Sequence, residues 1–256
     1  MRLRQIGHLA WAGVLQLART RVYLNILVAG VALVLAALAF DRMSAGEGGR
    51  VLLDVGTAFV ALLVAVLAGV VSITGVTREI ETKVASVVTA RPLSRVDYVL
   101  GRFATAAALV VLSNLALGAV LAVVLVATDS AHAVLAFGAV LFASLEGLVI
   151  AAIAIFFGVG SSSTMSALFT GTIFILGRLT EELARLIEHD KFGGATALLK
   201  AVHALLPHLP AFDLTPLAHG ASASALDLAQ RAGYGLLYAG AFLAAAAFRF
   251  SRRDLL

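Results

Sequence analysis

The sequence holds few side chains that could do chemistry, and the most unusual is a carboxylate inside an apolar run. Glu146 stands between Leu145 and Gly147 in the run 134–157. A carboxylate at that depth costs a few kcal/mol or more unless it is paired or protonated. We therefore expect Glu146 to line a translocation path or gate, or to make a structural hydrogen bond to a neighbouring helix. Asn114, in the run 103–127, is a candidate partner, and its amide suits contact between helices better than contact with a substrate.

Histidines are the next candidates, because four of them gather in one segment. His189, His203, His208 and His219 all lie between residues 180 and 233. His203 and His208 are five positions apart with a proline between them, so they do not share one helical face as the His-x-x-x-His pattern of zinc sites requires. We predict solvated or interfacial histidines and no metal site.

Catalytic chemistry finds little support. An intramembrane serine protease would suit the Gly/Ser-rich stretch 158–163, but it needs a histidine within a span to activate the serine, and no apolar run has one. No phosphate-binding G-x-x-x-x-G-K-[ST] loop is present, and the absence of cysteine excludes thiolate chemistry. We predict no catalytic residue and no cofactor in this chain, so any ATP and Mg²⁺ would be bound by another chain.

The composition identifies the class of protein. Hydrophobic residues make up 61% of the sequence and charged residues 13%, with a mean hydropathy of +1.00. Such values are typical of an integral membrane protein. The net charge of +4 does not indicate nucleic-acid binding, because the basic residues flank the apolar runs, where they act as topology signals and contact lipid headgroups.

Apolar runs predict an all-α membrane protein with six spans in a single domain, residues 1–256. The predicted spans are residues 22–40, 55–76, 103–127, 134–157, 167–179 and 234–250. Twelve of the 19 Lys and Arg residues would then lie on the side of the two termini. The positive-inside rule places that side in the cytoplasm.

Two segments outside the spans also have helical patterns. Residues 1–21 are predicted to form an amphipathic helix in the membrane interface, with Trp11 at headgroup depth, or else a simple helical extension of the first span. Residues 180–233 would lie outside the cell as two amphipathic helices, 181–188 and 197–206. An irregular stretch broken by prolines follows them, before a helix leads to the last span.

The longest charged interval on the cytoplasmic side covers residues 77–102. Its acids Glu79 and Glu81 follow an apolar run, and Pro92 forces a turn after a short amphipathic piece. Ser94 is placed to cap the next helix. A basic loop held inside the cell by its charge alone, with no partner, is one alternative for this segment.

The order of these residues carries a resemblance. An acid-rich segment, then A-R-P-L-S-R, then D-Y-V-L-G-R-F resembles the first cytoplasmic loop of ABC transporter type 2 permeases, although Lys83-Val84 stands where that family commonly has Gly-Thr. The stretch L-P-H-L-P-A-F-D-L resembles a second segment of some members, Leu-Pro-Asn-Leu-x-x-Phe-Asp/Asn-Leu. The matching loop residues are Glu79 and Glu81 (acids), Pro92, Ser94 and Arg95 (turn), and Tyr98, Gly101 and Arg102 (start of the third span).

The resemblance implies a function. The chain would be the permease subunit of an ATP-driven exporter in a bacterial inner membrane. It would work as a homodimer or heterodimer of permeases with two ATP-binding subunits. The loop would dock into the ATPase through Glu79, Glu81 and Arg95, with Pro92 and Ser94 fixing the turn.

Two alternatives remain. The chain could belong to an ABC-type complex that remodels or assembles an envelope partner without transport, for which the outer helices would bind an extracytoplasmic protein. A secondary transporter would need paired charges within broken spans, and the sequence offers Glu146 alone.

Overall fold

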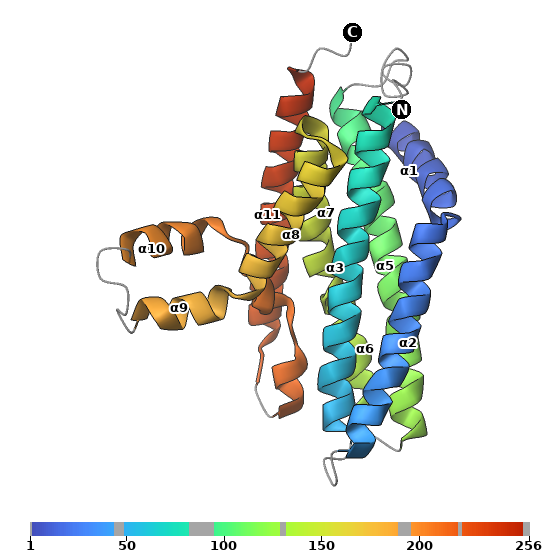
Figure 1. The fold of residues 1–256 in the computed structure, drawn as a ribbon, viewed down its shortest axis with the longest axis vertical. Coiled ribbons are helices and arrows are strands. Elements are labelled where there is room, and N and C mark those ends of the chain that lie inside the picture. Colours follow the sequence, from blue (N-terminus) through green and yellow to red (C-terminus); the bar gives the residue numbers. More distant parts are fainter. Residues whose placement is uncertain are drawn as a thin grey trace.

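The computed structural model describes residues 2–43, 49–81, 95–128, 132–188, 196–219 and 222–252, and all regular structure in these ranges is helical. Figure 1 shows a bundle of long helices with a smaller helical hairpin beside it. The helices are α1 (Arg2–Ala18), α2 (Arg21–Met43), α3 (Arg50–Glu81), α5 (Arg95–Ala127), α6 (Ala133–Phe142), α7 (Ser144–Gly160), α8 (Ser163–Arg178), α9 (Thr180–Glu188), α10 (Thr196–Leu205), η2 (Leu209–Phe212), η3 (Thr215–His219) and α11 (Ala225–Ser251).

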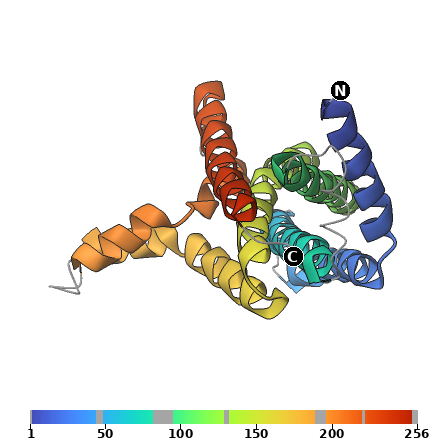
Figure 2. The same ribbon diagram turned by 90° about the horizontal axis from the view of Figure 1, so that it is seen from above.

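The first helix is set at an angle to the second (Figures 1 and 2). The chain turns at Thr20, whose hydroxyl donates to Leu17 O at 2.7 Å and accepts from the backbone N–H of Tyr23 at 3.3 Å. Helix α1 packs mainly on α5, where the Thr105 hydroxyl contacts Ala10 O at 3.3 Å.

Five helical segments of the described chain are long and apolar enough to cross a membrane. They are α2, α3, α5, the α6–α7 pair and α11. The predicted fifth span lies within α8, whose 16 residues reach about 24 Å, less than the roughly 30 Å hydrocarbon core. The predicted fourth span is divided at Ala143, where α6 ends and α7 begins.

Both termini lie at one end of the bundle, together with the ends of α3 and α5 that flank residues 82–94 (Figure 1). Helix α8 runs back from this end, and the segment 206–219 continues toward the opposite end before the chain turns back into α11. The described ends of the loop 77–102 are therefore grouped with the termini as predicted, whereas residues 82–94 lie outside the described residues.

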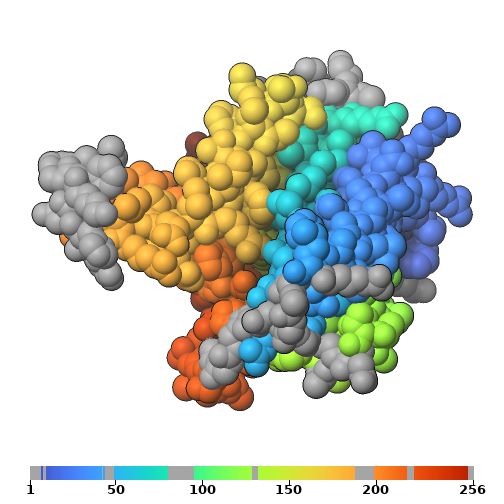
Figure 3. Space-filling model, turned by 60° about the horizontal axis from the view of Figure 1, so that its bottom comes forward, coloured from blue at the N-terminus to red at the C-terminus, as the bar shows by residue number. Residues whose placement is uncertain are grey.

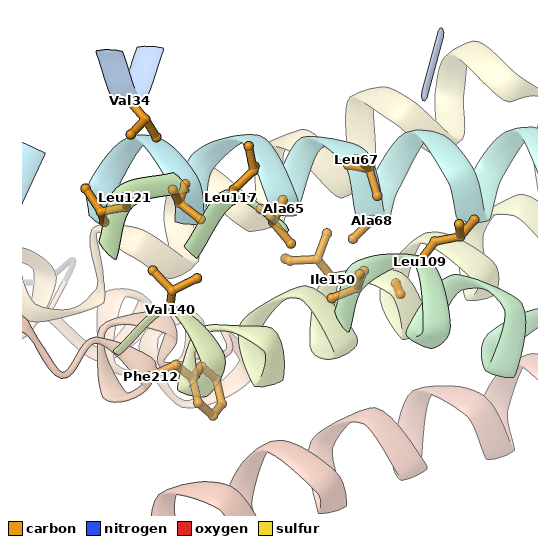
Figure 4. Close-up of a cluster of buried hydrophobic side chains, with 14 of the residues drawn as sticks. Val34, Ala65, Leu67, Ala68, Leu109, Leu117, Leu121, Val140, Ile150 and Phe212 are labelled. Atoms are coloured by element: carbon orange, nitrogen blue, oxygen red, sulfur yellow. The ribbon is translucent and has the colours of Figure 1, made fainter. Parts of the chain in front are cut away.

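The core of the bundle is built by α3, α5 and α7. Leucines and valines from these helices interlock with α2 and α6, as Figure 4 shows for Val34, Leu121, Val140 and Ile150. Because lipid tails are as apolar as these side chains, close packing rather than burial from water stabilises the bundle. Helix α11 covers α7 from the outside.

Helices α9 and α10 form at the places the sequence predicts and pack on each other. Figures 1 and 2 show this hairpin projecting sideways from the bundle. It contacts the rest of the chain mainly through α8 and η2.

The proline-rich segment after α10 folds back into the bundle. Leu209 and Phe212 are fully buried, and the Phe212 ring stacks on Tyr234 of α11 at 6.2 Å. Glycines make room for this segment. A Cβ atom at Gly177 would lie 2.9 Å from Pro207 O, and one at Gly235 would lie 2.8 Å from the Phe212 ring. Either is closer than a side-chain carbon tolerates, so these two positions require glycine.

Candidate functional site

The ends of α3 and α5 that flank residues 82–94 are joined by an ion pair. Glu79, near the end of α3, accepts hydrogen bonds from the Arg102 guanidinium and from the Tyr98 hydroxyl, the latter at 2.8 Å. The Arg102 side chain is 8% exposed and that of Glu79 is 14% exposed. Breaking so sheltered a pair costs more than breaking a surface pair, because either charge would be left without its partner.

The same cluster includes the end of the last helix. The Tyr98 ring stacks on Phe250 of α11 with centroids 5.2 Å apart. Arg95 Nη1 donates to the carbonyls of Phe250, at 3.2 Å, and Ser251, at 2.7 Å. The last carbonyls of a helix lack partners within the helix and carry its partial negative charge, so a guanidinium stabilises them. We call Glu79, Arg95, Tyr98, Arg102 and Phe250 the loop clamp.

The structure describes the side chains of only some of the predicted coupling residues. Glu79 and Arg95 make contacts within the chain that the sequence did not indicate. Glu81 is the last residue of α3, and its side chain lies outside the described part, as do Pro92 and Ser94. Their docking role stays a prediction.

The second candidate site surrounds Glu146, which lies in the first turn of α7. The residue is 2% exposed, and its Oε2 accepts a hydrogen bond from Arg178 Nη2 at 2.7 Å. Arg178 ends α8, and its side chain is 30% exposed. A negative charge is also favoured at a helix N-terminus, where the backbone N–H groups point outward.

The partner that the sequence pattern offered for Glu146 is wrong. Asn114 instead donates to Ser144 Oγ at 2.8 Å and joins α5 to α7 as a buried interhelical contact. Sequence reasoning passed over Arg178 because it follows an apolar run directly and resembles an ordinary flanking charge. The signal that could have identified Arg178 is its position at the end of an apolar run that is too short to span a membrane.

A pocket of about 320 Å³ opens next to the Glu146–Arg178 pair, between α3, the α6–α7 pair, α8 and the segment 212–216. Its floor is buried and includes Val140 and Phe212, whereas Asp213 and Pro216 at its rim are exposed. Glu146 Oε1 is buried and has no hydrogen-bond partner among the described residues. Asn114 does not line this pocket.

Among the described histidines, His208 has the most specific environment. Its Nδ1 lies 2.9 Å from the Thr180 hydroxyl, which itself donates to Gly177 O at 2.9 Å, so the ring nitrogen must donate to the threonine. Its backbone N–H donates to the Tyr234 hydroxyl at 2.9 Å. Burial lowers the pKa of His208. No group of metal-ligating side chains suited to an ion occurs in the described ranges.

Comparisons with known proteins agree with the architecture. The comparison with curated proteins finds no match. The model of one family, described as ABC-2 family transporter protein, matches residues 16–255. Its extent covers the elbow turn, every candidate span and the segment that folds back after α10. A match over nearly the whole chain, together with long apolar helices, shows a multi-pass membrane transport protein: the chain belongs to the ABC-2 family of transporter proteins.

Proposed function

We propose that this chain is the permease subunit of an ATP-driven ABC exporter, in which a separate subunit binds ATP and Mg²⁺ and hydrolyses the nucleotide. The observation that carries the proposal is the family match over residues 16–255. The ends of α3 and α5 that flank residues 82–94 lie at the end of the bundle where both termini lie, which supports it. We place this end of the bundle on the cytoplasmic side of a bacterial inner membrane, because basic residues concentrate there.

The loop clamp gives the coupling a physical route. A force applied to the loop by the ATPase would reach α3 through Glu79 and α5 through Arg102. It would reach α11 through the Tyr98 stack and the Arg95 cap. Since α11 lies along α7, the clamp joins the loop to the helix that carries Glu146. The helices would then tilt as rigid bodies when the ATPase subunits close.

This route divides the predicted coupling residues into two roles. Glu79 and Arg95 are positioning residues that hold the helix ends together. Glu81, Pro92 and Ser94 are left to meet the ATPase surface. Glu146 and its pocket would lie on the translocation path, whereas Asn114 holds α5 against α7. Helix α8 would make the remaining crossing, with residues 180–233 beyond it on the extracytoplasmic side, and the permease would work as a dimer.

The test is co-purification with the ATP-binding subunit encoded beside this chain. We expect the wild type to retain the ATPase in detergent and Glu81→Lys to lose most of it while remaining folded. Glu182→Lys is the matched control, because Glu182 is an exposed acid on the lateral helix α9. Glu79→Gln should retain the ATPase but lower its rate, since it weakens the clamp and leaves the loop surface intact.

Retention of the ATPase at wild-type level by Glu81→Lys would contradict the docking role of this residue. Failure of the folded wild type to retain any ATP-binding subunit would overturn the proposed function as a whole.

A second candidate function is favoured by the lateral hairpin. Helices α9 and α10 project from the bundle, and Leu205 at the end of α10 is 80% exposed. Such a hairpin suits contact with an extracytoplasmic protein, as in a complex that remodels the envelope without moving a substrate. Crosslinking from position 205 to a protein other than a second permease would favour this alternative.

A further inference from the structure

Another pocket lies at the base of the lateral hairpin, where the segment after α10 meets the first turns of α11. Its volume is about 390 Å³, which is within the range of small-molecule sites. None of its described lining residues is acidic, and the polar ones are His203, His208, Gln230, Arg231 and Tyr234. A lining with a guanidinium, an amide and imidazoles but no carboxylate suits an anion.

Arg231 supplies the charge. Its Nη1 donates to Ala211 O at 3.2 Å. Its Nε and Nη2 are neither buried nor bonded to any described residue, so both are open to a ligand. These two nitrogens form one edge of the guanidinium, and their N–H groups point the same way. Such an edge can hold two oxygens of one phosphate or carboxylate group.

Two other side chains of the lining add donors. Gln230 precedes Arg231 on α11, is exposed and makes no hydrogen bond to a described residue. His203 Nε2 is likewise neither buried nor bonded within the described chain, and it can donate in the tautomer that carries the hydrogen there. Because the oxygens of a phosphate are arranged tetrahedrally, donors from several directions can reach it, whereas a carboxylate is planar.

Contacts within the chain hold the walls of the pocket in place. The Tyr234 hydroxyl accepts from the backbone N–H of His208 at 2.9 Å, and the Tyr238 hydroxyl donates to Leu205 O at 2.9 Å. Together with the bond from Arg231, they attach the segment after α10 to α11 along the length of the pocket. A site whose walls are already fixed loses less entropy when a ligand binds.

Two acids lie near the pocket without lining it. Asp227, one turn before Arg231, interacts electrostatically with it, but the Asp227 carboxylate accepts hydrogen bonds from Ser224 in the helix cap. Glu181 acts in the same way on His208. The pocket therefore attracts an anion through direct hydrogen bonds from the guanidinium and not through an excess of positive charge.

We propose that this pocket binds a phosphate group, with the Nε–Nη2 edge of Arg231 holding two of its oxygens and Gln230 and His203 donating to the same group. Exposed leucines flank the site on α11, with Leu226 67% and Leu237 77% exposed. They offer an apolar surface to acyl chains, so a phospholipid headgroup is one source of the phosphate and inorganic phosphate is the other. The extracytoplasmic placement of the pocket rests on the proposed topology, whereas binding itself requires neither the ATPase nor transport.

The test is calorimetric titration of the purified, delipidated chain at pH 7 in dodecyl maltoside, a detergent without phosphate. The probes are dihexanoylphosphatidylglycerol, inorganic phosphate and dihexanoylglycerol, which has the acyl chains but no phosphate. We expect saturable binding of a phosphate-bearing probe and none of dihexanoylglycerol. Inorganic phosphate that binds within about tenfold of the lipid identifies free phosphate as the source, and weaker binding identifies the headgroup.

Four variants locate the site. Arg231→Gln should weaken binding by about tenfold or more, because the charged edge is lost. Arg231→Lys keeps the charge without the edge and should weaken binding by about threefold. Gln230→Ala should also weaken it by about threefold and is the safer variant for folding, because Gln230 is exposed. Arg185→Gln removes an exposed arginine outside the pocket and should leave binding unchanged.

Four results would overturn the proposal. They are no saturable binding of either phosphate probe by the folded wild type, equal binding of dihexanoylglycerol and phosphatidylglycerol, unchanged affinity in both Arg231→Gln and Gln230→Ala, and an equal loss of affinity in Arg185→Gln. None of these results bears on retention of the ATPase, so failure of this proposal and failure of the proposed export function are distinguishable.

Discussion

Removing one partner of the Glu146–Arg178 pair should destabilise the protein far more than removing the other. The exposed fractions of the two side chains predict which removal costs more. Glu146 is 2% exposed, so without Arg178 its charge would stay largely buried and lose the hydrogen bond to its Oε2. The Arg178 side chain is 30% exposed, so without Glu146 its guanidinium can turn toward water on its long stem. We therefore expect Arg178→Met to destabilise the protein far more than Glu146→Gln does.

The magnitudes follow from the cost of unpaired buried charge. Removing one partner from a buried pair costs about 3–5 kcal/mol, which we expect for Arg178→Met. Glu146→Gln should cost about 1–2 kcal/mol, close to the loss of one charged hydrogen bond. The double variant leaves no unpaired buried charge. It should therefore destabilise the protein by about as much as Glu146→Gln alone. The coupling free energy is then close to the cost of Arg178→Met alone, about 3–5 kcal/mol.

The assay is reversible unfolding of the four proteins in mixed micelles with increasing SDS, followed by far-ultraviolet circular dichroism. Glu182→Gln, which breaks the exposed Glu182–Arg185 pair, is the control and should change stability by less than about 1 kcal/mol. Equal costs for the two single variants, or a coupling below about 0.5 kcal/mol, would refute the reasoning from burial.

Two further predictions concern the segment that folds back after α10. Phe212→Ala should lower the free energy of unfolding by about 3–5 kcal/mol in the same assay, because Phe212 is fully buried. The control Phe248→Ala removes a ring that is 59% exposed and should lower it by less than about 0.5 kcal/mol. Similar losses for the two variants would show that the segment lies outside the core. Burial lowers the pKa of His208, so the imidazole takes up a proton more readily in the unfolded chain than in the folded one. The free energy of unfolding should therefore be highest above about pH 6.5 and fall as the pH drops below that value. His208→Asn keeps a donor for Thr180 but does not titrate, so a pH dependence equal to that of wild type in this variant would assign the effect to another group.

Local patterns predicted the elements well because each element carries its own signal. Apolar length identified the long helices, and helical periodicity identified α1, α9 and α10 close to their observed bounds. The proline spacing after α10 indicated irregular backbone, which appears as two short 3-10 helices. The span predicted at 167–179 is the exception, because hydropathy does not reveal that α8 ends at Arg178.

Contacts between distant residues were not predictable in the same way. Glu146 and Arg178 are 32 positions apart, and Glu79 and Arg102 are 23 apart. No periodicity relates such positions, and each arginine fits an ordinary flanking charge. The sequence therefore indicated which carboxylates were unusual but not which bases would join them.

The shortness of α8 has a consequence for anyone who maps this protein with reporter fusions. Counting long hydrophobic helices in the described part of the chain gives five crossings, an odd number, which would assign the two termini to opposite compartments. In the fold, α8 and the segment 206–219 together return the chain toward the far end before it turns back into α11. Figure 3 looks toward that end and shows the segment there, with the start of α3 beside it. If the chain crosses the membrane six times, as we propose, a reporter fused to either terminus should sample the same compartment.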